Sequence, residues 1–185
     1  MKYFLFCVFF FCIYILYEGL QKDPNLVPSN LISKEIPEFS IESLQGRNFT
    51  NVDLENKGVV ILNFFASWCP PCKIEHPQLL QLSNIIPVFG IAKKNKKKDL
   101  LPWLEELGSP YEIIGMDHNG LQSINWGVYG LPETFIIQDG LVKYRHVGPI
   151  MKRDLEIFKN LTKKNNDYFY FFYEYHSIGS RCNRT

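Results

Sequence analysis

The chain has little net charge and few cysteines, and each shortage excludes a class of protein. Its 185 residues carry 20 lysines and arginines against 19 aspartates and glutamates, which leaves a net charge of +1. The chain as a whole therefore has no electrostatic field that would recruit nucleic acid or an anionic surface. Its five cysteines are an odd number with one close pair, so a densely disulfide-bonded secreted scaffold is excluded. The sequence also lacks internal repeats.

The composition is that of one globular domain with extensions at both ends. Apolar residues make up 46% and charged residues 21% of the chain, and this length suffices for a real core. We assign four regions, namely an anchor or transmembrane segment (1–20), a tether (21–37), an α/β domain (38–162) and an aromatic C-terminal tail of unknown role (163–185). Cys7 and Cys12 lie in the first region and Cys182 in the last.

The N-terminal region is apolar but short for a membrane span. Residues 3–17 contain no charge, whereas a spanning helix usually needs about 20 apolar residues. A cleaved signal peptide is the alternative, because the length fits its apolar core. However, Tyr17 and the residues after it form no small-x-small cleavage site. We therefore predict an uncleaved signal anchor, with Lys2 favouring a cytoplasmic start and the domain outside the cytoplasm.

Apolar runs and turn residues predict an α/β sandwich. Residues 58–66 (GVVILNFFA) are nearly all apolar and often β-branched, which is typical of a strand buried on both faces. Its polar exception, Asn63, needs a buried partner. Asp139-Gly140 is a strong turn signal between two strands of a hairpin. Further strands are predicted at 39–41, 48–50, 88–92 and 111–116, and helices at 74–85, 100–107 and 151–161.

One cysteine pair lies where the central strand gives way to a helix. Cys69 and Cys72 stand three positions apart in NFFASWCPPCKIEHP, and a helix N-terminus stabilises a thiolate through its free N–H groups and dipole. A structural disulfide would close too small a loop to constrain the chain. A metal site would need more ligands than the pair and His76. A redox-active dithiol is therefore the favoured interpretation.

The same residues carry a family resemblance. FFASWCPPC resembles the active-site segment of thioredoxin-fold oxidoreductases. GVYGLPETFIIQDGLVKYRHVGPI is similar, more narrowly, to the CcmG/DsbE family of thiol:disulfide interchange proteins, which are membrane-anchored and act in bacterial cytochrome c maturation. The resemblance covers about residues 20–160. It implies a thioredoxin fold, with a central mixed β-sheet flanked by helices and an N-terminal membrane anchor helix.

The resemblance also implies a function. The chain would be a protein disulfide reductase at the bacterial inner membrane, with its domain in the periplasm. It would keep the haem-attachment thiols of apocytochrome c, or of a maturation protein that handles it, reduced. A membrane thiol transporter would supply the electrons, no cofactor is implied, and the protein would act as a monomer. General thiol-disulfide exchange with other clients is one alternative, and a copper-binding chaperone that uses the dithiol is another.

Residue roles follow from the same resemblance. It makes Cys69 the attacking nucleophile, Cys72 the resolving thiol, and Pro132 a cis-proline that faces their disulfide. Glu75 and Glu133 match acidic residues of the family's active site. We expect these acids to disfavour the Cys69 thiolate and to select a basic or polar client. The alternative is two solvated glutamates with weak coupling.

Residues beside the dithiol are predicted to tune it or to shape its surface. Pro71 sets a helical φ in the first turn, where a missing N–H costs little. Pro70 removes a donor and supplies no cation, which favours a reductant, although it could simply shape the turn. Trp68 either packs over the dithiol or is a plain rim aromatic. Three features depart from the family pattern, namely the lysine run at 93–98, Leu131 before the key proline, and the aromatic tail. We interpret the lysine run as a solvated loop, with acidic lipid or a partner as the alternative.

Overall fold

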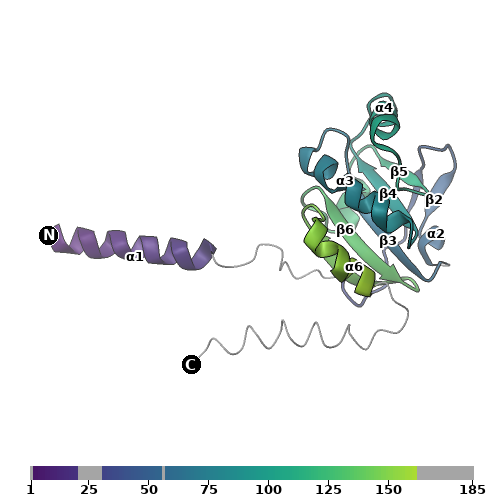
Figure 1. The fold of residues 1–185 in the computed structure, drawn as a ribbon. Helices are drawn as coiled ribbons and strands as arrows, with labels where there is room; N and C mark the ends of the chain where they lie inside the picture. The colour runs from purple at the N-terminus through teal and green to yellow at the C-terminus, as the bar shows by residue number, and fades with distance from the viewer. Residues whose placement is uncertain (1, 21–30, 56, 162–185) are drawn as a thin grey trace.

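A five-stranded mixed sheet forms the centre of the fold. The structure is a computed structural model that describes residues 2–20, 31–55 and 57–161. The strand order is β5-β4-β3-β6-β7 (Figure 1). β4 pairs in parallel with β3 and β5, whereas β6 pairs antiparallel with β3 and β7. The strands are β3 (Val59–Phe65), β4 (Val88–Lys93), β5 (Ile114–Asp117), β6 (Glu133–Gln138) and β7 (Leu141–Val147).

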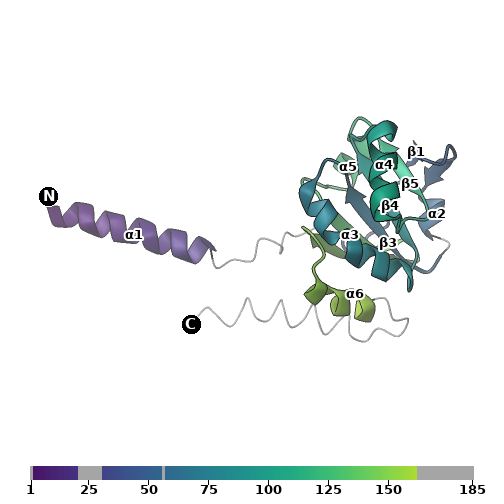
Figure 2. The same cartoon turned by 45° about the horizontal axis from the view of Figure 1, so that its top comes forward.

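Alternate side chains of the central strand β3 pack into two apolar layers, one on each face of the sheet. Ile61 and Phe65 belong to the layer on one face of the sheet, whereas Leu62 and Phe64 belong to the layer on the other. This alternation follows from the two-residue period of a strand. The first layer packs against α3 (Pro70–Ser83), α4 (Lys97–Leu107) and α6 (Leu155–Leu161), and Figure 2 shows α3 and α6 on the same side of the sheet.

The opposite face is covered by smaller elements. They are β1 (Ser40–Glu42), β2 (Asn48–Thr50), α2 (Val52–Glu55) and α5 (Leu121–Asn125). β1 and β2 pair antiparallel as a separate two-stranded sheet. Phe39 and Phe49 pack edge to face here, and Trp126 lies fully buried against Phe64 and Phe135. Both faces of β3 are therefore covered, as its apolar sequence predicts.

Most of the predicted elements are present, with local differences. The central strand and the hairpin are confirmed, and both turn residues, Asp139 and Gly140, have positive φ angles, of 50° and 75°. The predicted closing helix is divided into a short 3-10 turn (Lys152–Asp154) and α6. α2 and α5 were not predicted, because four or five residues are too few to show a helical period.

The segment before the domain is attached to the edge of the sheet. Ser33 N–H donates to the Val142 carbonyl (2.8 Å), and Val142 N–H donates back to the carbonyl of Lys34 (3.0 Å). Ile36 N–H donates to the Gly140 carbonyl (3.0 Å), and its side chain is buried. The tether predicted over 21–37 is thus part of the folded domain from residue 33 onward. The tail at 163–185 lies outside the described residues.

The apolar N-terminal region forms α1 (Lys2–Leu20), the purple helix in Figure 1. A long helix is therefore present where the sequence predicts an anchor. Among the described residues, however, we find no helix whose length and apolar character would suffice to cross a membrane. The membrane anchor thus stays a prediction.

Candidate active site

The two cysteines form a disulfide at the start of α3. Cys69 is the N-cap residue, Pro70 and Pro71 occupy the first two helical positions, and the Cα atoms of Cys69 and Cys72 lie 5.3 Å apart. Cys72 N–H donates to the carbonyl of Cys69 (3.1 Å). The prolines fit here because the first N–H groups of a helix have no intrahelical partner to lose. The arrangement brings a reducible bond to the positive end of a helix dipole.

Both cysteines are buried in the disulfide-bonded form. Cys69 is 4% exposed and Cys72 is 1% exposed. Cys69 is only slightly the more accessible of the two, so neither cysteine is openly exposed in this disulfide-bonded form. Trp68 is 59% exposed, and its indole N–H donates to the carbonyl of Lys94 (3.3 Å). Trp68 is therefore an exposed aromatic beside Cys69, and its packing over the dithiol stays a prediction.

Pro132 lies at the end of the sheet where β3 finishes and the chain continues to Cys69. The Leu131–Pro132 peptide bond is cis. The next residue, Glu133, pairs with Phe64 near the end of β3. The carbonyl of Pro132 accepts a hydrogen bond from Gly148 N–H (3.0 Å). This position agrees with a proline beside the dithiol, and its role toward a substrate stays a prediction.

Glu75 is buried behind the disulfide, one helical turn beyond Cys72. Its two carboxyl oxygens accept hydrogen bonds from the Asn63 side-chain amide (2.8 Å) and from Ile150 N–H (3.1 Å). Burial raises the pKa of Glu75 to about 8, although these two hydrogen bonds oppose that shift. The solvated glutamate considered as an alternative is therefore wrong. Glu75 is also the partner that the sequence requires for Asn63.

The Asn63 side chain joins a buried polar cluster. Its amide N–H group donates to the hydroxyl of Thr134 (3.0 Å), while its carbonyl oxygen accepts from the hydroxyl of Tyr111 (2.9 Å). Burial first, and then the nearby carboxyl of Glu75, hold the pKa of Tyr111 well above its usual value. Sequence reasoning missed Tyr111 and Thr134. The polar exception in β3 was the one signal that such a cluster existed.

Glu133 is buried and forms an ion pair with Arg145, a residue that the sequence analysis did not identify. One carboxyl oxygen accepts from Tyr129 N–H (3.1 Å) and Gly130 N–H (3.2 Å), and the other accepts from the Arg145 side chain (2.8 Å). Arg145 also donates to the Gly127 carbonyl (2.8 Å), and its side chain is only 6% exposed. Glu133 is fully buried, so it holds the loop before Pro132 in place. It is not a solvated acid, and it is not exposed to a client.

His76 is occupied by structural contacts. Its Nε2 lies 2.9 Å from the Gly108 carbonyl, and its ring packs edge to face on Trp103. Burial lowers the pKa of His76, and the hydrogen bond to Gly108 opposes the shift. Within residues 2–20, 31–55 and 57–161, no group of three or more histidine, cysteine or acidic side chains could hold a metal ion.

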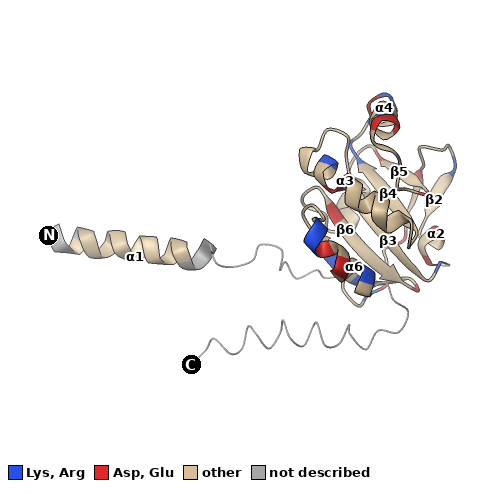
Figure 3. Ribbon diagram, in the orientation of Figure 1, with Lys and Arg blue, Asp and Glu red and all other residues tan. Residues whose placement is uncertain are grey.

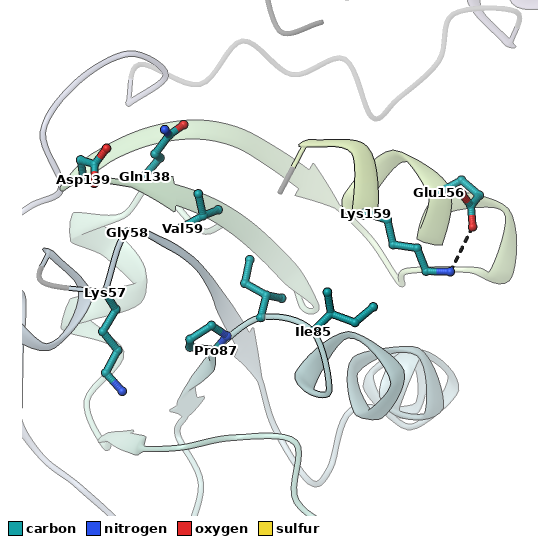
Figure 4. Close-up of a pocket in the computed structure, with 10 residues that line it drawn as sticks. Lys57, Gly58, Val59, Ile85, Pro87, Gln138, Asp139, Glu156 and Lys159 are labelled. Atoms are coloured by element: carbon teal, nitrogen blue, oxygen red, sulfur yellow. Dashed lines mark hydrogen bonds and ion pairs between the residues drawn. The ribbon is translucent and has the colours of Figure 1, made fainter. Parts of the chain in front are cut away.

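A hollow of about 490 Å³ lies at the opposite end of the strands (Figure 4). Val59, at the start of β3, and the apolar residues Ile85 and Pro87 line it, with Lys57 and Lys159 also among its lining residues. Since β3 runs from this end toward Cys69, the hollow is separated from the disulfide by the length of the sheet. None of the predicted site residues lines it.

Comparisons with known proteins agree with this geometry. The family model for the AhpC/TSA family matches residues 32–145. A thiol:disulfide interchange protein DsbE homolog from Paracoccus denitrificans is 41% identical over 137 residues, which cover 73% of this chain and 76% of that protein. DsbE of Escherichia coli K12 is 42% identical over 135 residues, which cover 71% of this chain and 73% of that protein.

A solved structure shows the same fold. The crystal structure of a protein from Chlorobium tepidum, described as a thiol:disulfide interchange protein DsbE, superposes with a TM-score of 0.62 at 26% identity. The match covers 69% of this chain and 92% of that one. Because the dithiol, the thioredoxin-like sheet and these relatives agree, the chain belongs to the thioredoxin-like AhpC/TSA family and, within the oxidoreductases, to the DsbE thiol:disulfide interchange proteins.

Proposed function

We propose that this oxidoreductase works as a protein disulfide reductase outside the cytoplasm, where it keeps the cysteines of apocytochrome c free for haem attachment. Covalent attachment of haem needs thiols, and an oxidising compartment converts neighbouring thiols into disulfides. A dedicated reductant would therefore be required. The observation that carries the proposal is the reducible Cys69–Cys72 bond at a helix N-terminus, in a chain about 40% identical to DsbE proteins.

The proposed reaction is a two-step exchange. In the reduced protein the Cys69 thiolate attacks one sulfur of the client's disulfide, which releases the other client sulfur as a thiolate. The Cys72 thiolate then attacks Cys69 and releases the second client thiolate. The client gains two electrons and, after protonation, two thiols. The protein ends with the Cys69–Cys72 disulfide found in the structure.

The oxidised protein must be reduced again before another turnover. The same exchange can run in reverse, with a thiol of an electron donor attacking the disulfide. We propose a membrane thiol transporter as this donor. The client could also be a maturation protein that handles apocytochrome c, since the chemistry is the same.

We further propose that α1 anchors the protein in the bacterial inner membrane, with the domain in the periplasm. The proposal is supported by the uncharged run at 3–17 and by the helix over Lys2–Leu20. An anchored protein should remain in the membrane fraction after an alkaline wash, at full length. Recovery of a soluble form that begins near residue 20 would instead favour a cleaved signal peptide.

Haem attachment in cells tests the reductase role. Cells that lack the native protein would express the wild type, Cys69→Ser or Cys72→Ser, and covalent haem would be measured on a c-type cytochrome. Both variants should lose attachment, and a small-molecule thiol in the medium should restore it. Restoration identifies a shortage of reductant as the defect. Normal attachment with either variant would contradict the proposal and favour general exchange with other clients.

A further inference from the structure

We infer that the lysines at residues 93–98 form a docking surface for an acidic segment of the client polypeptide. The run was predicted to be a loop, but it extends from the last residue of β4 through residues 94–96 into the first turn of α4, and we name it the basic loop. This inference rests on the proposed function, because it assumes that the dithiol reacts with a protein disulfide. It assigns a charge preference to the surface beside Cys69. That preference is opposite to the one expected from Glu75 and Glu133.

The basic loop is fixed to the residues that lead into Cys69. The side chain of Asn95 accepts a hydrogen bond from Ser67 N–H (2.7 Å) and donates to the Ser67 hydroxyl (2.9 Å). The indole of Trp68 donates to the Lys94 carbonyl (3.3 Å). Asn95 is 2% exposed, so these bonds are largely shielded from water. A chain bound at Cys69 would therefore meet the basic loop.

The charges of the basic loop point to solvent. Lys94, Lys96, Lys97 and Lys98 are all exposed, and none forms an ion pair with another described residue. Asp99 follows as the single acid at the start of α4. The more distant acids of that helix, Glu105 and Glu106, are exposed as well, and Glu106 pairs with Lys73 (3.2 Å). Figure 3 shows both signs of charge on α4.

The acids next to the dithiol cannot offset this positive charge for a client. Glu75 and Glu133 are both fully buried, and Glu133 is paired with Arg145. Of the charges nearest the dithiol, an approaching chain would therefore meet the exposed lysines of the basic loop, with Asp99 beside them, and not the buried carboxylates of Glu75 and Glu133. Complementary charge of this kind mainly raises the rate of encounter and suppresses partners of like charge.

An acidic protein segment fits the basic loop better than an anionic membrane does. Asn95 of the basic loop is hydrogen-bonded to Ser67, and Lys94 is hydrogen-bonded to Trp68. Both partners lie within two residues of Cys69. A basic loop pressed against lipid would place this neighbourhood of the disulfide at the membrane surface, where a client chain has little room. A peptide can instead lie along the lysines while its cysteine reaches Cys69.

Two disulfide peptides of opposite charge test the inference. Both would carry the same internal disulfide, one flanked by glutamates and the other by lysines, and the full-length protein in detergent would be used in its reduced form. We expect the acidic peptide to react faster at low salt, by on the order of tenfold, and this preference to shrink as salt is added. Lys94→Asn combined with Lys96→Gln should remove most of the preference, and asparagine suits the positive φ of Lys94 (47°).

A matched control separates local from global charge. The double variant Lys34→Gln/Lys57→Gln removes the same amount of positive charge elsewhere. The backbone of Lys34 is hydrogen-bonded to β7, and Lys57 lines the distant hollow. This variant should keep the preference for the acidic peptide. Equal rates for the two peptides with the wild type would overturn the inference and leave the proposed function intact. Failure to reduce either peptide would instead count against the proposed function.

Lipid binding is the remaining outcome. The wild type and the double variant Lys94→Asn/Lys96→Gln would be compared on vesicles of neutral phosphatidylcholine with and without anionic phosphatidylglycerol. We expect the anionic lipid to change binding of the wild type no more than it changes binding of the double variant. An increase confined to the wild type, together with equal peptide rates, would assign the basic loop to the membrane and overturn the inference.

Discussion

The side-chain amide of Asn63 lies 2.8 Å from a carboxyl oxygen of Glu75, both within the fully buried interior. This hydrogen bond joins the central strand β3 to α3, the helix that begins directly after Cys69 and contains Cys72. Glu75 has no cation among its hydrogen-bond partners, which are Asn63 and the backbone of Ile150. No positive charge therefore offsets the desolvation that raises the pKa of Glu75. This buried acid makes the stability of the folded protein depend on pH.

We expect Glu75 to make the folded protein less stable as the pH rises. Its pKa is about 8 in the folded state and near 4.5 when unfolded. A raised folded pKa means that the contribution is fully present below about pH 4.5 and is lost as the pH rises through about 8. Glu75→Gln should remove this loss, which is on the order of several kcal/mol. Denaturant unfolding of the oxidised protein at a series of pH values measures it.

The control for Glu75 is an exposed glutamate of α4. Glu105→Gln should leave the pH dependence of the unfolding free energy as it is in the wild type, because that side chain is solvated. If Glu75→Gln showed the same slope as the wild type between pH 4.5 and 8, the assignment of a raised pKa to Glu75 would be wrong.

His76 should produce the opposite pH dependence. Burial lowers its folded-state pKa below 6.5, so its neutral form is favoured by folding. Its contribution is complete above about pH 6.5 and is lost as the pH falls toward the lowered folded pKa. His76→Gln should flatten the unfolding free energy in that acidic range, whereas His118→Gln, an exposed position, should not. Identical acid dependence in the two variants would contradict the assignment.

Removal of the Arg145 side chain should be costly because it leaves Glu133 buried without a cation. Arg145→Met is expected to lower the free energy of unfolding by about 3 to 5 kcal/mol. The double variant Glu133→Gln/Arg145→Met should lose less than the two single variants combined, since neither charge is then stranded. Arg153→Met, at a side chain that is 83% exposed, should change stability little. Additive losses would show that the two residues are not coupled.

The central strand, the hairpin and the close cysteine pair follow closely from sequence patterns. The apolar run of β3 predicts a doubly buried strand, and Asp139-Gly140 predicts the hairpin turn. Each signal is local, because it depends on residues that are neighbours in the chain. The family resemblance then places the two cysteines and the proline in one fold.

The inward face of α3 shows why the site could not be predicted in the same way. The apolar residue Ile74 of α3 is 54% exposed, and Ile85, just beyond the helix, is 62% exposed. Glu75 and His76 are buried instead, because their partners come from Asn63, Ile150 and Gly108, far away in the chain. A hydrophobic pattern contains no information about such polar partners, and the Arg145–Glu133 pair was missed for the same reason.

Covalent trapping tests the central claim, that the protein exchanges disulfides through Cys69. Without the resolving thiol, Cys72→Ser should accumulate mixed disulfides with client proteins, whereas Cys69→Ser should not, because Cys69, the N-cap residue of α3, is the attacking sulfur in the proposed exchange. Trapped species would be separated under non-reducing conditions and identified by mass spectrometry, with Cys69→Ser/Cys72→Ser as the control. The account predicts apocytochrome c or a maturation protein bound to Cys69. Equal trapping by both single variants, or capture by neither, would contradict it.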